Sequence, residues 1–256
     1  SSMSAHVQPR RRARALVLGG WSPGPLDRVR AVLSSEVEFE EPTIPMPPAG
    51  LRWCINPFWC LLLLYLAVGL PLLLDQAAKI GSTPAMSGIL QGVVVLVTLL
   101  LARALIAGLV WFAIRDGMRV ASAHIQSYRP DVVIGFSWGG GVACWLLAEK
   151  GWSGPTLLLA PTAAAMGRAA WCRERRFPEP LDGCPVHVFH AQHDGFCPEK
   201  QARSLERSGC KVHYCDDDHM LLRSVRDIVH SLRHLVASVD PSNSIGGTSG
   251  EFIGAA

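Results

Sequence analysis

Short runs of apolar residues that alternate with helical patterns most constrain how this 256-residue chain can fold. Strands that are apolar at every position are typical of sheets buried on both faces. Alternation of such strands with helices favours a parallel sheet with helices on both faces. We therefore predict a mostly parallel α/β fold whose polar loops gather at the carboxyl ends of the strands. The runs, with the loops that follow them, are residues 15–24, 131–138, 155–161 and 185–195.

The segments between these runs carry apolar residues at helical spacing. The last of them shows the pattern most plainly, because its leucine, valine and isoleucine residues form one stripe. The predicted helices are 25–35, 117–128, 139–150, 199–208 and 221–239, and two further strands are predicted at 37–44 and 211–215.

Residues 135–139, Gly-Phe-Ser-Trp-Gly, place Ser137 where a buried strand becomes a helix. A tight turn at this point exposes the serine oxygen, and the flanking glycines avoid a clash with the neighbouring strand or helix. The amino terminus of the following helix points backbone N–H groups toward developing negative charge. An ordinary tight turn with a chance serine is the alternative. The strand before and the helix after favour a catalytic nucleophile.

Two further polar residues follow later strands in the order that a Ser…Asp…His triad requires. Asp194 follows the penultimate strand, and His219 follows the last strand, just before the final helix. Asp194 is otherwise a common type of turn residue before glycine. The rival acids 216–218 adjoin His219 in sequence, where a carboxylate is poorly placed to accept the ring N–H. We therefore predict Ser137 as nucleophile, His219 as base and Asp194 as its orienting acid.

A metal site formed by His187, His190 and His193 is a second interpretation of the same region. On a strand, residues 187 and 190 point to opposite faces, so the three rings do not readily converge on one ion. No metal and no other cofactor is expected.

The chain resembles the α/β-hydrolase family in its small esterase, thioesterase and dienelactone-hydrolase-like form. The resemblance covers residues 14–50 and 117–239. It implies a hydrolase fold and an oxyanion hole formed by the backbone N–H groups of Trp21 and Trp138. The family often has His-Gly-x in the first loop, where this chain has Gly19-Gly20-Trp21. The motifs that carry the resemblance are GFSWG at 135–139, HAQHDGFCP at 190–198, DDDHML at 216–221 and LVLGGWSPG at 16–24.

Residues 51–116 interrupt this pattern with long apolar stretches. Residues 54–74 and 82–102 are each 21 residues without a charge, and eleven more follow Arg103. A 21-residue helix is about 31 Å long and matches the hydrocarbon core of a bilayer. We therefore predict a transmembrane helical hairpin. Arg103 would snorkel, face a partner or mark a helix that spans obliquely. A hydrophobic lid of a soluble lipase is the alternative.

Charge and aromatic residues around the hairpin predict its orientation. Three arginines lie on the catalytic side and one lysine lies in the turn, which places the catalytic domain on the cytosolic, matrix or stromal side. The eight cysteines form no C-x-x-C pair, which agrees with a reducing compartment. The arginines are Arg52, Arg115 and Arg119, the lysine is Lys79, and tryptophans near the predicted interfaces are Trp53, Trp59 and Trp111.

The expected organisation is a flexible basic tail at 1–13, a hydrolase core at 14–50 and 117–239, the hairpin at 51–116, and a flexible Gly/Ser-rich tail at 240–256. A net charge of +3 with one basic run, 10–12, gives no nucleic-acid surface.

The sequence thus predicts a membrane-anchored serine hydrolase that cleaves an acyl ester or thioester, with the lipid bilayer as its partner and a role in lipid metabolism. The alternative from another class is a hydrolase-like accessory subunit of a membrane complex, in which the hairpin and the carboxyl-terminal tail serve assembly.

Overall fold

The computed structural model describes residues 11–46, 63–172 and 184–239. Most of the predicted tails 1–13 and 240–256, and the first part of the predicted hairpin, therefore lie outside the described residues, as do Arg52, Trp53 and Trp59.

Six strands form one sheet in the order β2-β1-β3-β4-β5-β6, and every neighbouring pair is parallel. The parallel sheet predicted from the apolar runs is therefore confirmed. The chain direction across the sheet reverses between β1 and β3, and such a switch point is where open α/β sheets carry their sites. The strands are β1 Ala13–Leu18, β2 Val37–Glu40, β3 Val132–Phe136, β4 Thr156–Leu159, β5 Val186–Ala191 and β6 Lys211–Cys215.

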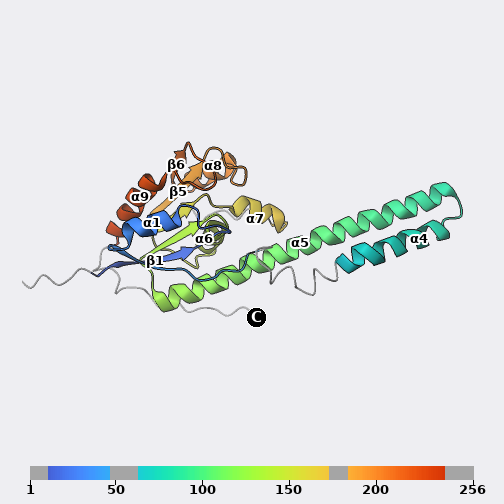
Figure 1. Cartoon of the computed structure of the whole chain (residues 1–256), viewed down its shortest axis with the longest axis horizontal. Helices are drawn as coiled ribbons and strands as arrows, with labels where there is room; N and C mark the ends of the chain where they lie inside the picture. The colour runs from blue at the N-terminus through green and yellow to red at the C-terminus, as the bar shows by residue number, and fades with distance from the viewer. Residues whose placement is uncertain (1–10, 47–62, 173–183, 240–256) are drawn as a thin grey trace, which may run out of the picture.

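Helices cover both faces of the sheet (Figure 1). The helices α1 (Leu26–Leu33) and α9 (Val225–Ala237) pack on one face. The helices α5 (Pro84–Tyr128) and α6 (Trp138–Ala148) pack on the other, where α8 (Glu199–Arg207) contributes Leu205. The short helix α7 (Ala163–Ala169) follows β4.

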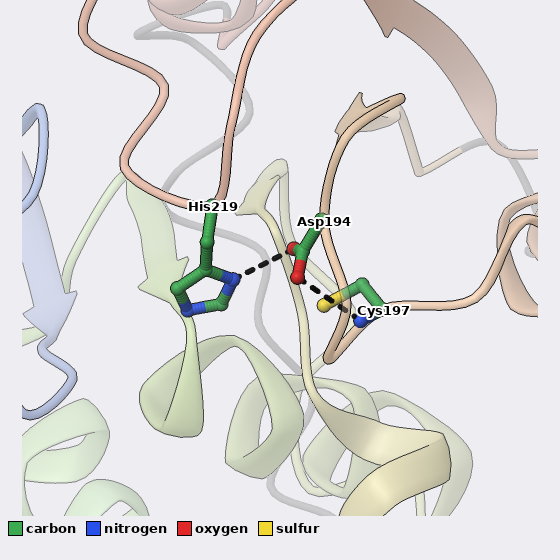
Figure 2. Close-up of side chains that lie close together, drawn as sticks. All are labelled: Asp194, Cys197 and His219. Carbon is green, nitrogen blue, oxygen red and sulfur yellow. Dashed lines mark hydrogen bonds and ion pairs between the residues drawn. The ribbon is translucent and has the colours of Figure 1, made fainter.

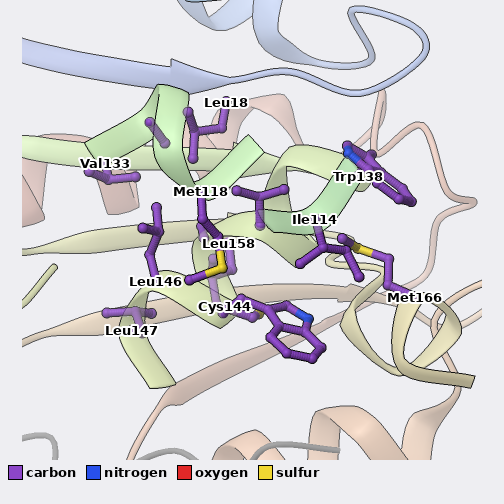
Figure 3. Packing of buried hydrophobic residues seen from close by; sticks show 14 of the residues in the cluster. Leu18, Ile114, Met118, Val133, Trp138, Cys144, Leu146, Leu147, Leu158 and Met166 are labelled. Carbon is purple, nitrogen blue, oxygen red and sulfur yellow. The ribbon is translucent and has the colours of Figure 1, made fainter. Parts of the chain in front are cut away.

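The apolar runs are continuous because alternate residues of each strand enter different cores. In β1, Leu16 and Leu18 join the α5–α6 side, whereas Ala15 and Val17 join the α1–α9 side. All four side chains are fully buried. Figure 3 shows the α5–α6 side, where Ile114 and Met118 of α5 lie against residues of α6 and the sheet.

Helix α5 is one unbroken helix of 45 residues, and it differs from the separate segments expected from the sequence. The predicted boundary at residue 116 lies inside it. Small buried residues at 113, 117 and 121 let its second half approach α6 closely, and a Cβ at Gly117 would lie 3.3 Å from Val142. Helical geometry therefore continues directly from the apolar arm into the packed core.

The first half of α5 runs beside α4 (Leu70–Ile80) as a hairpin that projects from the sheet (Figure 1). A π-helical turn, η1 (Tyr65–Gly69), precedes α4. Thr83 caps α5 by accepting a hydrogen bond from the N–H of Met86. The Tyr65 hydroxyl and Thr98 Oγ1 lie 3.1 Å apart across the hairpin.

Most apolar side chains of this hairpin are exposed. Among the described residues, α5 is the helix long and apolar enough to cross a membrane, and 17% of its most apolar 18-residue stretch is buried. A core helix of a soluble protein would bury most of such a stretch. The exposed residues include Leu63, Leu64, Leu72, Ile89, Leu96, Leu99, Leu100 and Leu101.

The last helix begins at Val225, four residues later than the pattern predicts. The carboxylate of Asp217 accepts hydrogen bonds from the N–H groups of Arg223 and Ser224, and Leu221 has a positive φ of 51°. These contacts hold residues 217–224 as a loop, and this loop carries His219.

The packing of α5 on the sheet can be tested with Ile114→Ala. Ile114 is fully buried, so we expect the free energy of unfolding to fall by about 2–5 kcal/mol, because the lost side chain leaves a cavity. Phe112→Ala is the matched control, since Phe112 is 64% exposed on the same helix. Its effect should stay within about 0.5 kcal/mol. Denaturant unfolding in detergent measures both, and equal losses would contradict the packing described.

Candidate active site

Ser137 lies at the sharp turn between β3 and α6 that the glycine pattern predicts. Its φ of 52° and ψ of −115° are strained for a residue with a side chain. A Cβ at Gly139 would lie 1.9 Å from the carbonyl oxygen of Leu18, and one at Gly20 would lie 2.8 Å from the Cβ of Ser137. The turn therefore has no room for larger residues at these two positions.

The three predicted residues come together at the carboxyl edge of the sheet. His219 Nε2 lies 2.8 Å from Ser137 Oγ, and His219 Nδ1 lies 2.6 Å from Asp194 Oδ2. Figure 2 shows the second contact, with Asp194 on the loop after β5 and His219 on the loop after β6. A carboxylate at Nδ1 favours the tautomer with its proton there, which leaves Nε2 free to accept the serine proton.

Asp194 is held in place by backbone donors. Its side chain is fully buried, and Oδ1 accepts hydrogen bonds from the N–H groups of Phe196 at 2.7 Å and Cys197 at 3.2 Å. Burial by itself would raise the pKa of Asp194, but the bonds from His219 and Phe196, the His219 charge and the contact with Cys197 outweigh it and lower this pKa. The carboxyl group therefore stays ionised beside the imidazole.

The rival acids bind elsewhere. Asp216 contacts His193 at 2.9 Å, Asp217 binds the backbone of the 217–224 loop, and Asp218 accepts a hydrogen bond from the N–H of Met220. The carboxylate that reaches His219 is the one predicted from strand order.

The backbone N–H groups of Trp21 and Trp138 were expected to form an oxyanion hole. Within residues 11–46, 63–172 and 184–239, neither N–H has a hydrogen-bond acceptor. The N–H of Gly139 donates to the carbonyl of Gly19 at 3.1 Å and ties the first loop to the serine turn. Trp138 is the first residue of α6, so its N–H lies at the positive end of that helix dipole. Two donors are thus left available beside Ser137.

A cavity of about 470 Å³ opens onto Ser137 and His219. This volume lies within the range of small-molecule sites. Its walls are largely apolar, and α5 and α7 supply much of them. These lining residues are Ile106, Leu109 and Val110 of α5 and Ala165, Met166 and Ala169 of α7.

The part of α5 in this wall is not predicted from the sequence, because the apolar pattern of residues 51–116 indicates a separate insertion. For Arg103, the sequence leaves three alternatives open and identifies no specific partner residue. The Arg103 guanidinium donates to the carbonyl oxygens of Ala169 and Arg168 at 2.7 Å each, and it lies 4.5 Å from the ring centre of Trp171. Arg103 therefore binds the carboxyl end of α7.

Thr162 is a further residue of the site that the sequence does not predict, although it follows β4 at the same carboxyl edge of the sheet. Its N–H and its hydroxyl each donate to the carbonyl of Ser137 at 3.1 Å. These bonds help to hold the strained serine turn.

The described residues contain one group of metal-ligating side chains, Asp194, Cys197 and His219. The side-chain atoms that would bind an ion already form hydrogen bonds within the protein. The thiol of Cys197 donates to the carbonyls of Ala160 and Pro161, and burial, with the nearby Asp194 charge, raises its pKa, so it remains protonated. A protonated thiol is not a metal ligand. The group is better explained by the Asp194–His219 contact than by an ion.

The three histidines of the other metal interpretation have separate partners. His187 binds Ser231 of α9 at 2.8 Å, His190 packs against Tyr214, and His193 binds Asp216 on an exposed loop. Burial, with help from Lys211 and neighbouring histidines, lowers the pKa of His187 to about 4. It is therefore neutral at physiological pH.

Comparison with known proteins adds information on the fold. No family model and no curated protein matches the sequence. TT1662 from Thermus thermophilus shares 14% identity with a TM-score of 0.51, covering 88% of this chain and 89% of its own. A structure of metagenome-derived lipolytic enzymes shares 10% identity with a TM-score of 0.50, covering 89% and 94%.

A candidate hydrolase of the alpha/beta superfamily from Xanthomonas campestris pv. campestris shares 16% identity over 89% of this chain and 100% of its own, with a TM-score of 0.47. At 14% and 10% identity, the likeness to TT1662 and to the lipolytic enzyme structure concerns the fold alone. The parallel sheet with helices on both faces agrees with the fold predicted from the apolar runs.

The lowered pKa of Asp194 predicts how this residue affects stability at different pH. A carboxylate whose pKa is lower in the folded than in the unfolded state stabilises the fold above the unfolded value, and this contribution is lost as pH falls through the folded value. Asp194→Asn should therefore lower the melting temperature at neutral pH, and the difference from wild type should shrink below about pH 4.

Melting temperatures of the two proteins across this pH range test the prediction. Asp216→Asn is the control, because its side chain is 81% exposed and its contact with His193 contributes little. A deficit in Asp194→Asn that is constant with pH would contradict the assignment.

Proposed function

We propose that the protein is a membrane-anchored serine hydrolase that cleaves an acyl ester or thioester. The observation that carries this proposal is the linked set of contacts from Asp194 through His219 to Ser137, at the switch point of a parallel sheet. The cavity beside it and the two N–H groups without acceptors support the same chemistry.

In the first half of the reaction, Ser137 Oγ attacks the acyl carbonyl carbon while His219 Nε2 takes the hydroxyl proton. The N–H groups of Trp21 and Trp138 stabilise the oxyanion of the tetrahedral intermediate. The bond from carbon to the leaving oxygen or sulfur then breaks, and His219 gives its proton to the leaving group. Asp194 keeps the imidazole oriented and stabilises its charged form.

In the second half, water attacks the acyl-enzyme and His219 takes one of its protons. Collapse of the intermediate breaks the bond from the acyl carbon to Ser137 Oγ, which receives that proton. The free acid leaves, and the starting state returns. No metal or organic cofactor takes part in this scheme.

The α4–α5 hairpin is the proposed membrane anchor. Its exposed apolar side chains would be costly in water, whereas a bilayer would bury them. The distance along α5 from Pro84 to Arg103 is about 29 Å, which matches a hydrocarbon core. Arg103, Arg115 and Arg119 follow on the catalytic side, which favours the cytosol, matrix or stroma for the hydrolase domain.

The nucleophile is tested with a fluorophosphonate probe on protein extracted from membranes. Wild type should be labelled, and Ser137→Ala should lose the label, because the probe captures an activated serine. His219→Ala should slow labelling by about 10³-fold or more, since the base is gone. Ser22→Ala, which removes another serine of the same cavity, should still be labelled.

Folded wild-type protein that takes no label would oppose the enzyme and support the accessory-subunit role. Loss of labelling in Ser22→Ala, with labelling kept in Ser137→Ala, would contradict the assignment of Ser137 as the nucleophile.

Membrane anchoring is tested by alkaline carbonate extraction. Wild type should stay in the membrane pellet. A protein with both Leu96→Asp and Leu100→Asp should be released, because each charge costs about 2.5–3.5 kcal/mol at the centre of a spanning helix. Val32→Asp is the control, since Val32 is exposed on α1, and it should remain in the pellet. Release of wild type would instead indicate a soluble enzyme with a hydrophobic lid.

A further inference from the structure

The cavity next to Ser137 and the projecting hairpin share one helix. Ile106, Leu109 and Val110 line the cavity, and Ile106 lies only three residues, about 4.5 Å of helical rise, beyond Arg103. The apolar surface of α5 therefore passes from the hairpin into the cavity wall, with Arg103 as the one charged residue between Pro84 and Ile114.

Arg103 does not interrupt this apolar surface, because its guanidinium N–H groups donate hydrogen bonds to α7. The guanidinium binds two carbonyl oxygens at the end of α7 and stacks on Trp171. Helix dipoles favour a cation at this end. Arg103 thus joins the two helices that form the apolar walls, at the level where α5 leaves the sheet domain (Figure 1).

The cavity rim is also apolar and exposed. Trp21 is 61% exposed, Phe196 is 58% exposed, and Ile106 is 42% exposed, and all three line the cavity. Trp171, 58% exposed, lies beside Arg103. Tryptophan and arginine together are typical of the zone where a protein meets lipid headgroups. A rim of this composition suits contact with a bilayer better than contact with water.

We propose that the acyl chain of the substrate reaches Ser137 directly from the bilayer, along the cavity wall that α5 provides. The substrate class is then a membrane-resident, long-chain acyl ester or thioester. This inference rests on the proposed serine hydrolase function and adds the source of the substrate and the residues that select it. The acyl chain of the substrate packs between Ile106 and Leu109 on one side and the α7 residues on the other, while its carbonyl group lies beside Ser137.

Esters with acyl chains of different length test whether the α5 residues of the cavity wall contact the acyl chain. Purified full-length protein in phosphatidylcholine vesicles is given fluorogenic acetyl, octanoyl and palmitoyl esters. Ile106→Trp narrows the cavity at its hairpin end, so the ratio of kcat/KM for palmitoyl to acetyl ester should fall by about tenfold or more. Ile89→Trp is the matched control, since it adds the same side chain to an exposed position of α5 within the hairpin. It should keep the wild-type ratio.

A second experiment tests whether the substrate enters the cavity from the bilayer that holds the protein. Protein and palmitoyl ester are placed in the same vesicles or in separate vesicles. Hydrolysis should be at least about tenfold faster when both share a bilayer, because an apolar chain leaves lipid slowly. Fluorophosphonate labelling of Ser137 in each variant reports whether the site is folded.

The outcomes separate the two levels of the proposal. An Ile106→Trp protein with the same chain-length ratio as Ile89→Trp, or equal rates in shared and separate vesicles, would overturn bilayer access while labelling and ester hydrolysis uphold the hydrolase. Wild type that neither takes the label nor cleaves any ester would instead remove the proposed function itself.

Discussion

The contact between the start of α6 and the end of β1 determines the geometry of the site. At Gly139 the helix lies so close to the carbonyl of Leu18 that a single added carbon atom would overlap it. This closeness forces Ser137 into a strained turn and brings the loop of Gly20 and Trp21 beside it. The strain, about 1–3 kcal/mol, is sustained because Thr162 and the neighbouring strands hold the turn from the other side.

Helix α5 has two halves with different surroundings. Its second half packs small residues against α6, and its first half presents leucine, valine and isoleucine outward. Cavity residues lie where the two halves meet. The apolar character of the helix therefore serves packing, the cavity wall and the proposed anchor along one continuous surface.

The strands and the three polar residues could be predicted because their signals are local. A fully apolar strand, a glycine-flanked serine and the order of Asp194 and His219 are all legible in one dimension. The cavity wall could not be predicted, since it depends on how α5 packs against α7, more than fifty residues away. Arg103 was obscure for the same reason, because its acceptors are backbone carbonyls that no side-chain pattern marks. The late start of α9 follows from Asp217, whose backbone bonds compete with the helix.

The continuity of α5 has a consequence for anyone who would make a smaller version of this protein. Excising the apolar insertion at residues 51–116 would also remove Val110, Ala113 and Ile114, which are core residues of the sheet domain. A deletion would have to end before Arg103, so that the shortened chain keeps the core residues of α5 and the hydrogen bonds from Arg103 to α7. The hairpin is thus not a separable part of the fold, because the helix that continues from it supplies core residues of the sheet domain.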